Sequence, residues 1–112
     1  MKLNHLGISV TDVIAAREFL ETYFGLKGIG KNNRKMTHLQ DDNGLILSLF
    51  KGPPITQPET THIGFIQESE EQVNEIYERL KRHGFDVQPP ARSHGWTFAF
   101  VAPGGFAIEV VS

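Results

Sequence analysis

The sequence predicts an α+β fold built from two tandem βαβββ modules. A histidine followed by an aliphatic residue, a glycine and an apolar residue occurs in N-H-L-G-I and again in T-H-I-G-F. Three landmarks recur in the same order along the 112-residue chain: His5 with His62, Gly25 with Gly84, and Gly44 with Gly105. Their offsets of 57, 59 and 61 residues drift by only four. Two copies of one module explain this spacing better than a longer repeat array does.

The first module begins with an alternating segment over residues 2–10, which is typical of a half-buried strand. A helix is expected over about 12–24, with Thr11 or Asp12 as its N-cap and Gly25 as its end. Its apolar stripe is formed by Val13, Ala16, Leu20 and Phe24. Three strands then fit near 27–31, 35–40 and 44–51, with a turn at Lys31-Asn32-Asn33.

The second module repeats this order. The expected elements are a strand over 60–67, a helix over 70–83, and strands near 85–89, 95–102 and 105–111. Ser69 and Gln72 have the spacing of a capping box. The helical stripe consists of Val73, Ile76, Tyr77 and Leu80. His83 falls in the last helical turn, where a cation complements the helix dipole, and we expect it to have a structural role.

The whole chain, 1–112, is expected to form one domain. The first module covers about 1–51 and the second about 60–112. The linker between them, about 52–59, lies within K-G-P-P-I-T-Q-P-E, which holds three of the six prolines. Because proline stiffens the chain and cannot donate to a sheet, this segment is expected to be a stiff connection.

Composition excludes several classes of protein. The chain is 39% hydrophobic and 21% charged, with a net charge of −2 and interspersed signs. This pattern gives no basic groove for nucleic acid and no cationic face for a membrane. The absence of cysteine excludes disulfides and thiolate metal sites. The N-terminal residues do not resemble a secretion signal, and no apolar run approaches the roughly 20 residues of a membrane span. We therefore expect a cytoplasmic protein.

A four-stranded sheet with one helix has one covered face and one free face, and two such modules can enclose a cleft. Alternation along the first strand directs the aliphatic side chains toward the helix and His5 toward the cleft. The same alternation places His62 and Glu109 on cleft-facing positions. Glu109 stands between Ile108 and Val110, where a carboxylate is costly to bury without a cation or donors.

Two imidazoles and one carboxylate form the facial triad that holds a divalent metal and leaves positions open for water or substrate. The sequence therefore predicts a metal site at His5, His62 and Glu109. Other interpretations stay open, because a single strand histidine is more often a hydrogen-bonded rim or core residue. A glutamate in a final strand usually faces solvent.

Four further side chains are weaker candidates. Trp96 and Phe50 could line a substrate pocket, whereas the neighbouring Phe98 and Phe100 are expected in the core. Arg92 could pair with an anionic substrate, or it could be a solvated loop residue. His38 could supply a substrate contact or proton transfer, or it could be a rim histidine.

The segments L-N-H-L-G-I-S-V-T-D, T-H-I-G-F-I and F-A-F-V-A-P-G-G-F-A-I-E-V-V resemble the vicinal oxygen chelate superfamily. This superfamily includes glyoxalase I, extradiol dioxygenases, fosfomycin-resistance enzymes and bleomycin-resistance proteins. The resemblance covers essentially the whole chain. It implies paired βαβββ modules with curved mixed sheets around a cleft. It also implies a divalent ion (Fe, Mn, Zn or Ni) held by His5, His62 and Glu109.

Two departures from the family pattern bear on function. Glyoxalase-like members carry a fourth metal ligand, usually glutamate, four residues past the glycine of the first module. Counted from Gly44, this position is Ser48 here, a poor ligand that could contact substrate instead. The remaining three ligands look more like those of extradiol dioxygenases. The turn Ala102-Pro103-Gly104-Gly105 also differs from the family's Asp-Pro-Asp-Gly, and we expect this difference to be structural.

Two functions follow from the resemblance. The first is a metalloenzyme, a dioxygenase or lyase, in which the metal chelates vicinal oxygens of a small substrate. The alternative is a metal-free protein of the bleomycin-resistance type that binds a small molecule. A homodimer is expected, because two free sheet faces and exposed strand edges need covering. The modules could pair within one chain or swap between two chains.

Overall fold

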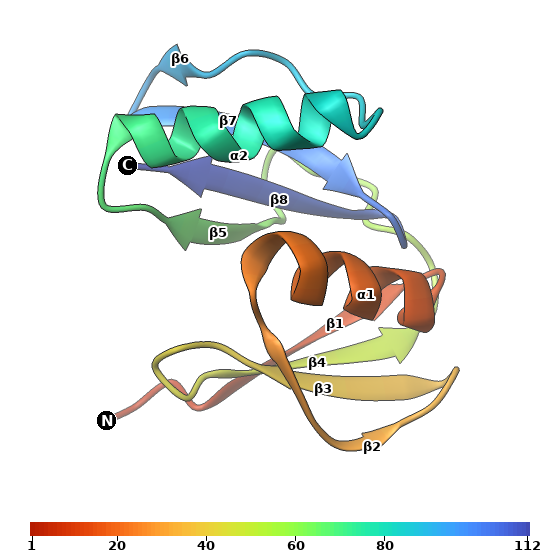
Figure 1. Cartoon of the computed structure of the whole chain (residues 1–112). Helices are drawn as coiled ribbons and strands as arrows, with labels where there is room; N and C mark the ends of the chain where they lie inside the picture. The colour runs from red at the N-terminus through yellow and green to blue at the C-terminus, as the bar shows by residue number, and fades with distance from the viewer. The chain divides into compact units, whose positions relative to one another are not determined.

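The structure, a computed structural model, describes residues 1–112 and contains the βαβββ order twice (Figure 1). The first set comprises β1 (His5–Val10), α1 (Val13–Phe24), β2 (Lys27–Asn32), β3 (Met36–Gln40) and β4 (Ile46–Lys51). The second comprises β5 (Ile63–Ile66), α2 (Glu70–Arg82), β6 (Ala91–Arg92), β7 (Trp96–Ala102) and β8 (Phe106–Val111). The predicted α+β fold class is confirmed. Neither helix is long and apolar enough to cross a membrane.

Each set forms a four-stranded mixed sheet. The strand orders are β1-β4-β3-β2 and β5-β8-β7-β6. In both sheets the first strand lies at an edge and pairs in parallel with the last strand. The neighbouring pairs β2–β3, β3–β4 and β6–β7 are antiparallel. The two modules thus repeat one topology as well as one order of elements.

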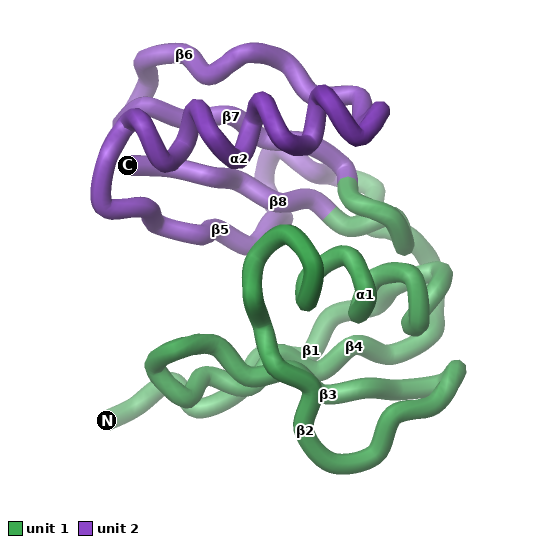
Figure 2. Tube along the Cα trace, viewed as in Figure 1, with its two compact units in different colours: residues 1–56, 102–106 green, residues 57–101, 107–112 purple.

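The chain divides into two compact units (Figure 2). Unit 1 contains residues 1–56 and 102–106, and unit 2 contains residues 57–101 and 107–112. The turn between β7 and β8 therefore belongs to unit 1. There the amide of Thr11 donates to the carbonyl of Gly104 at 2.8 Å, and the amide of Ile55 donates to the carbonyl of Gly105 at 2.8 Å. Gly104 and Gly105 have φ values of 97° and 72°, which only glycine adopts readily, so this turn is structural.

In unit 1, α1 covers one face of the sheet. Asp12 is its N-cap, since the carboxylate accepts from the amide of Ala15 at 3.0 Å, and Gly25 ends it with φ of 68°. Phe19 is buried, whereas the predicted stripe residue Phe24 is only partly buried. The buried apolar side chains of this unit are Val10, Val13, Ala16, Phe19, Leu20, Leu26, Leu39, Leu47, Leu49, Ala102 and Phe106.

One polar contact is built into this core, and the sequence pattern does not reveal it. Thr37 on β3 is fully buried, and its hydroxyl accepts from Nη1 of Arg17 on α1 at 2.8 Å. Nε of Arg17 also donates to Glu21 at 3.2 Å. The guanidinium lies where a Cβ would stand on Gly28, so glycine at this position admits the arginine.

In unit 2, α2 begins at a cap that differs slightly from the predicted capping box. Ser69 accepts from the amide of Gln72 at 3.2 Å, as expected. The side chain of Gln72, however, accepts from the amide of Glu68 at 2.8 Å instead of from Ser69. The buried apolar side chains are Val73, Leu80, Val87, Phe98, Phe100, Ala107, Ile108 and Val110. Phe98 and Phe100 are therefore core residues, as predicted.

The prediction of a strand near 85–89 is wrong. This segment forms no strand, and the short β6 (Ala91–Arg92) follows it and pairs with β7. Pro89 and Pro90 lie at the end of the segment, and proline has no amide hydrogen for a sheet ladder. The burial of Val87 shows that a side chain from this segment still reaches the core.

Replacement of Asp12 by alanine tests the start of α1. The Asp12→Ala variant removes the acceptor for the amide of Ala15, so the free energy of unfolding should fall by about 1 kcal/mol. Urea denaturation measures this change. Asp42→Ala is the matched control, because Asp42 is exposed in a turn and should change stability by less than about 0.5 kcal/mol. Equal losses in the two variants would contradict a capping role.

Candidate metal and substrate site

The pairing of first and last strands defines equivalent positions in the two units. In unit 1, Gly7 pairs with Ser48, and in unit 2, Gly64 pairs with Glu109. Ser48 and Glu109 are therefore structural counterparts. In each unit the histidine, His5 or His62, lies two residues before the paired glycine. Side chains two apart on a strand share a face, so His5 of β1 lies on the same face as Ser48. His62 directly precedes β5, and its ring lies near the carboxylate of Glu109.

Within unit 2 this arrangement brings two histidines to one carboxylate. Nε2 of His62 lies 3.9 Å from Oε1 of Glu109, and Nε2 of His94 lies 2.9 Å from Oε2. The Glu109 side chain is 16% exposed, while Ile108 and Val110 on either side are fully buried on the helix-covered face. The predicted orientation of Glu109 away from the core is observed. His94 was not singled out from the sequence.

Thr97 also approaches this carboxylate. Its hydroxyl lies 3.1 Å from Oε2 of Glu109 and 2.8 Å from the carbonyl oxygen of Val110. A hydroxyl has one proton, so it donates to one of these oxygens at a time. His94 can therefore donate a hydrogen bond to Oε2 of Glu109 whether the Thr97 hydroxyl donates to Oε2 or to the carbonyl of Val110.

Unit 1 presents a pocket of about 350 Å³ on the face away from α1. It is lined by Asn4, His5, Ile29, Gly30, His38, Ile46 and Ser48. Nδ1 of His38 lies 2.7 Å from the hydroxyl oxygen of Ser48, whose residue is only 7% exposed. Nδ1 of His5 lies 3.0 Å from Oδ1 of Asn4, which leaves Nε2 of His5 without a hydrogen bond. Three of the predicted site residues thus share one pocket.

Phe50 extends this face of unit 1. Its ring is edge-on to that of His38, with 6.4 Å between the ring centroids. A Cβ on Gly7 would stand 3.3 Å from the Phe50 ring, so the aromatic ring lies against the bare glycine. The side chain is 41% exposed and gives the face an apolar surface beside His38.

The structure does not bring Arg92 and Trp96 to the face of Glu109. Nε1 of Trp96 donates to Oδ1 of Asn74 on α2 at 2.8 Å. Arg92 forms an ion pair with Glu70 of α2 at 2.8 Å, and its guanidinium lies 5.2 Å from the centroid of the Trp96 ring. Both candidates pack toward the helix. Trp96 is two residues from Phe98 and shares its helix-covered face of β7, and Arg92 packs against Trp96. Trp96, a possible pocket residue from the sequence, thus lies on the helix-covered face of β7.

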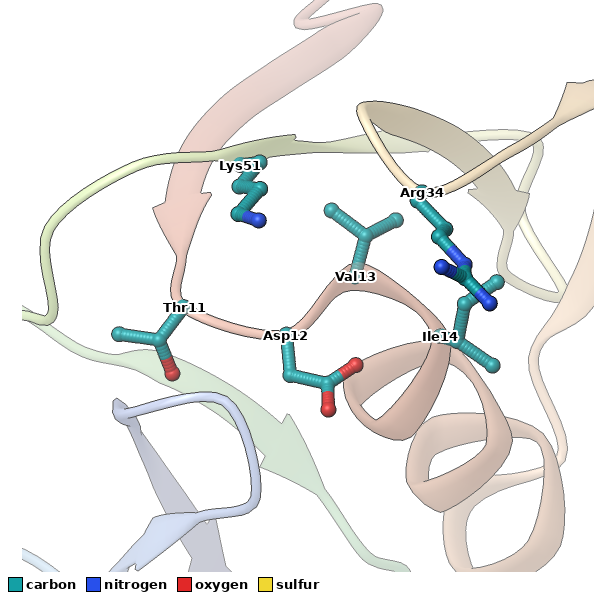
Figure 3. A pocket seen from close by; sticks show the side chains of 6 residues that line it. All are labelled: Thr11, Asp12, Val13, Ile14, Arg34 and Lys51. Carbon is teal, nitrogen blue, oxygen red and sulfur yellow. The ribbon is translucent and has the colours of Figure 1, made fainter.

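A second pocket of unit 1, about 400 Å³, lies at the N-terminal end of α1 (Figure 3). It is lined by Thr11, Asp12, Val13, Ile14, Arg34 and Lys51. Figure 3 shows Arg34 beside Ile14 and Lys51 on the other side of Val13. The carboxylate of Asp12 already accepts from the helix amide, and the pocket contains no histidine. Its residue types do not extend the predicted metal site.

No group of three or more His, Cys, Asp or Glu side chains in the structure is arranged to hold a metal ion. Four of the five histidines, together with Glu109, instead occur as two sets. His5 and His38 lie in unit 1, and His62, His94 and Glu109 lie in unit 2.

Comparison with known proteins defines the class. A model of the Glyoxalase/Bleomycin resistance protein/Dioxygenase superfamily matches residues 2–110, and the chain belongs to this superfamily. A solved structure described as a possible glyoxalase from Bacillus cereus is 50% identical, with a TM-score of 0.92. The alignment covers 100% of this chain and 99% of that chain. The resemblance inferred from the histidine and glycine motifs is thus confirmed.

More distant relatives have named activities. The fosfomycin-resistance protein FosX from Listeria monocytogenes, solved with Mn(II) and 1S,2S-dihydroxypropylphosphonic acid, is 24% identical with a TM-score of 0.81. That alignment covers 98% of this chain and 88% of FosX. A probable trivalent organoarsenical cleaving enzyme of Bacillus subtilis (strain 168) is 28% identical over 85 residues. These residues are 76% of this chain and 58% of that enzyme, so the match spans just over half of its length.

Two glycines of unit 2 provide a test of the packing around the carboxylate. A Cβ on Gly95 would stand 2.5 Å from the carbonyl oxygen of Ser112 and 2.9 Å from Cγ2 of Val111. Gly95→Ala should therefore lower the free energy of unfolding by about 1–3 kcal/mol. A Cβ on Gly64 meets nothing within 4 Å, so Gly64→Ala should leave stability unchanged or raise it by up to about 1 kcal/mol. Urea denaturation of the two variants checks the contrast, and a reversed order would refute the described packing.

Proposed function

We propose that the protein binds a divalent metal through His5, His62 and Glu109, and that the metal holds two neighbouring oxygens of a small substrate. The observation that carries this proposal is that only one of the two oxygens of the Glu109 carboxylate is hydrogen-bonded. One oxygen, Oε2, is hydrogen-bonded, whereas Oε1 faces Nε2 of His62 across 3.9 Å and accepts no hydrogen bond. A half-buried carboxylate oxygen beside an imidazole nitrogen is a site that a cation would stabilise.

The donor atoms fit such an ion. At the ligand–metal–ligand angles of tetrahedral and octahedral sites, two bonds of about 2.0–2.1 Å place their donor atoms about 2.9–3.4 Å apart, which is less than the 3.9 Å between His62 and Glu109. An ion bonded to both atoms therefore requires the two side chains to turn toward one another. One carboxylate oxygen and two imidazole nitrogens suit iron, manganese, zinc or nickel.

His5 is proposed as the third ligand because it is the counterpart of His62 in the repeat. Its Nδ1 is held by Asn4 at 3.0 Å, and Nε2 has no partner within the chain. Metal-binding histidines are commonly oriented in this way, through a hydrogen bond at the ring nitrogen that does not bind the metal. Asn4 would thus fix the ring of His5 with Nε2 directed outward.

Ser48 is proposed to contact the substrate and not the metal. Its hydroxyl is occupied by His38 at 2.7 Å, and a neutral hydroxyl is a weak ligand beside imidazole and carboxylate. Three protein ligands would leave coordination positions for the substrate. His38 could then take or return a proton through the Ser48 hydroxyl, while Phe50 supplies an apolar wall. The bound metal would supply Lewis acidity and a template for the substrate oxygens.

The proposed reaction class is that of a dioxygenase or lyase acting on a compound with vicinal oxygens. The FosX structure contains Mn(II) together with a dihydroxypropylphosphonic acid, which is a vicinal diol. The Bacillus cereus structure that matches the full length of this chain is described as a possible glyoxalase. After the metal is known, a binding screen of diols, catechols and hydroxy ketones would identify the substrate class.

The alternative is a metal-free protein that binds a small molecule. The pocket of about 350 Å³ in unit 1 favours it, because Ile29 and Ile46 give that pocket apolar walls. In such a protein the metal ligands could be replaced without loss of ligand binding.

Metal binding by purified protein tests the proposed function. The wild type, prepared without chelator, should take up one ion per chain when iron, manganese, zinc and nickel are each supplied in turn. Glu109→Gln, His5→Ala and His62→Ala should each weaken binding by more than the roughly 100-fold seen for partners outside the coordination sphere. Isothermal titration calorimetry and metal analysis measure the effect. A wild type that takes up none of these metals would sink the metalloprotein proposal and favour the alternative.

Two control variants accompany this experiment. Glu78→Gln makes the same chemical change on an exposed residue of α2 and should leave the affinity unchanged. Ser48→Ala should also leave it within about threefold, because the hydroxyl is not proposed to be a ligand. A large loss in Ser48→Ala would show that the serine takes part in coordination.

We also propose that the chain forms a homodimer. Both first strands lie at sheet edges, and Ile66 on the edge strand β5 is 83% exposed. Val101 on β7 is 62% exposed. Exposed edges with apolar side chains favour association with a second copy. Size-exclusion chromatography with light scattering should give twice the monomer mass of 12.6 kDa, and a pure monomer would contradict the proposal.

A further inference from the structure

We propose that His94 is a positioning residue that holds one oxygen of Glu109 and thereby directs the other toward the metal. The inference rests on the proposed function, because Oε1 of Glu109 is there a metal ligand. No motif of the repeat contains His94. In unit 1 the residue equivalent to Glu109 is Ser48. Its hydrogen-bond partner is His38 on the neighbouring strand β3, and not a residue in a turn.

The contact between His94 and Glu109 gives the two oxygens of the Glu109 carboxylate different roles. Nε2 of His94 lies 2.9 Å from Oε2, a normal distance for a charge-assisted hydrogen bond. His62 faces the other oxygen, Oε1, at 3.9 Å. The terminal torsion of a glutamate is broad and the carboxylate turns easily. A donor on Oε2 therefore determines where Oε1 points.

The turn that carries His94 is itself fixed. The amide of Ser93 donates to the carbonyl of Gly95 at 2.9 Å. Trp96, the next residue, exchanges two backbone hydrogen bonds with Ser112, at 3.2 and 3.0 Å. Gly95 packs so closely on Ser112 that a Cβ there would overlap its carbonyl oxygen. The His94 side chain is 62% exposed, but the next two residues, Gly95 and Trp96, are held against Ser112, which follows β8.

No other group replaces this donor fully. The Thr97 hydroxyl reaches Oε2 at 3.1 Å but lies closer, 2.8 Å, to the carbonyl oxygen of Val110. Without His94 the carboxylate would depend on that single shared proton. Partners that orient a metal ligand from outside the coordination sphere typically affect affinity by about 10–100-fold when removed.

The experiment compares His94→Ala, His94→Gln and Ser93→Ala. His94→Ala should weaken the affinity for Zn(II) or Ni(II) about 10–100-fold at unchanged stoichiometry. His94→Gln retains an N–H donor near the position of Nε2 and should restore affinity to within about threefold of wild type. Ser93→Ala is the control in the same turn, because the Ser93 side chain makes no hydrogen bond, and should bind as wild type. Thermal unfolding of the metal-free variants verifies that all are folded.

A second readout separates positioning from coordination. The nitrogen hyperfine couplings of bound Cu(II) count the coordinated imidazoles, and this count should be the same in wild type and His94→Ala. A count that falls by one in His94→Ala, without rescue by His94→Gln, would make His94 a ligand and overturn the positioning role. Wild-type affinity in His94→Ala would also overturn it, while the proposed metal site would stand. A wild type that binds no metal would remove both proposals.

Discussion

The parallel pairing of the first and last strand in each unit determines which side chains can meet on the sheet face away from the helix. It places Gly7 beside Ser48 and Gly64 beside Glu109. Because glycine has no side chain, the space above each pair stays available. In unit 1 the Phe50 ring occupies part of it, and in unit 2 a Cβ on Gly64 would meet no atom within 4 Å. In the repeated His-x-Gly motif, the histidine is thus followed two positions later by a glycine that leaves space on the same side of the sheet.

The helix-covered faces make this arrangement rigid. Leu39, Leu47 and Leu49 are buried on the face that α1 covers, and Phe106, Ile108 and Val110 are fully buried. Removing such side chains typically costs several kcal/mol, so the strands cannot slide by one residue without large loss. The same packing keeps the intervening residues, Ser48 and Glu109, on the opposite face. The alternation of apolar residues along the strands therefore determines the face on which Ser48 and Glu109 lie.

Strand alternation is a local property, and it is the part of the structure that the sequence predicts well. Period-two patterns assign His5, His62 and Glu109 to the face away from the helix. The observed pairing places His5 on the face of Ser48 in unit 1 and Gly64 beside Glu109 in unit 2, while His62 directly precedes β5. The segment 85–89 was mistaken for a strand because its apolar residues resemble one, although Pro89 and Pro90 prevent a ladder.

Side chains in turns were harder to predict. His94 reaches Glu109 only because the turn before β7 is fixed by backbone contacts with Ser112. These contacts join residues far apart in the sequence, and no local pattern encodes them. Trp96 lies in β7, where the sequence predicts a strand, but its side chain is directed to the helix by a hydrogen bond to Asn74 of α2, a contact between distant residues.

The two units carry the same geometry but different charge. At equivalent positions one unit has a carboxylate, Glu109, and the other has a neutral hydroxyl, Ser48, bound to His38. A divalent ion held by two neutral imidazoles and one carboxylate would retain a net charge of about +1, whereas a second carboxylate would cancel it. Residual positive charge at a metal favours anionic oxygen ligands and lowers the pKa of a bound hydroxyl group. The replacement of a carboxylate by serine would therefore strengthen binding of a substrate that chelates through deprotonated oxygens, with His38 beside Ser48 to receive the proton.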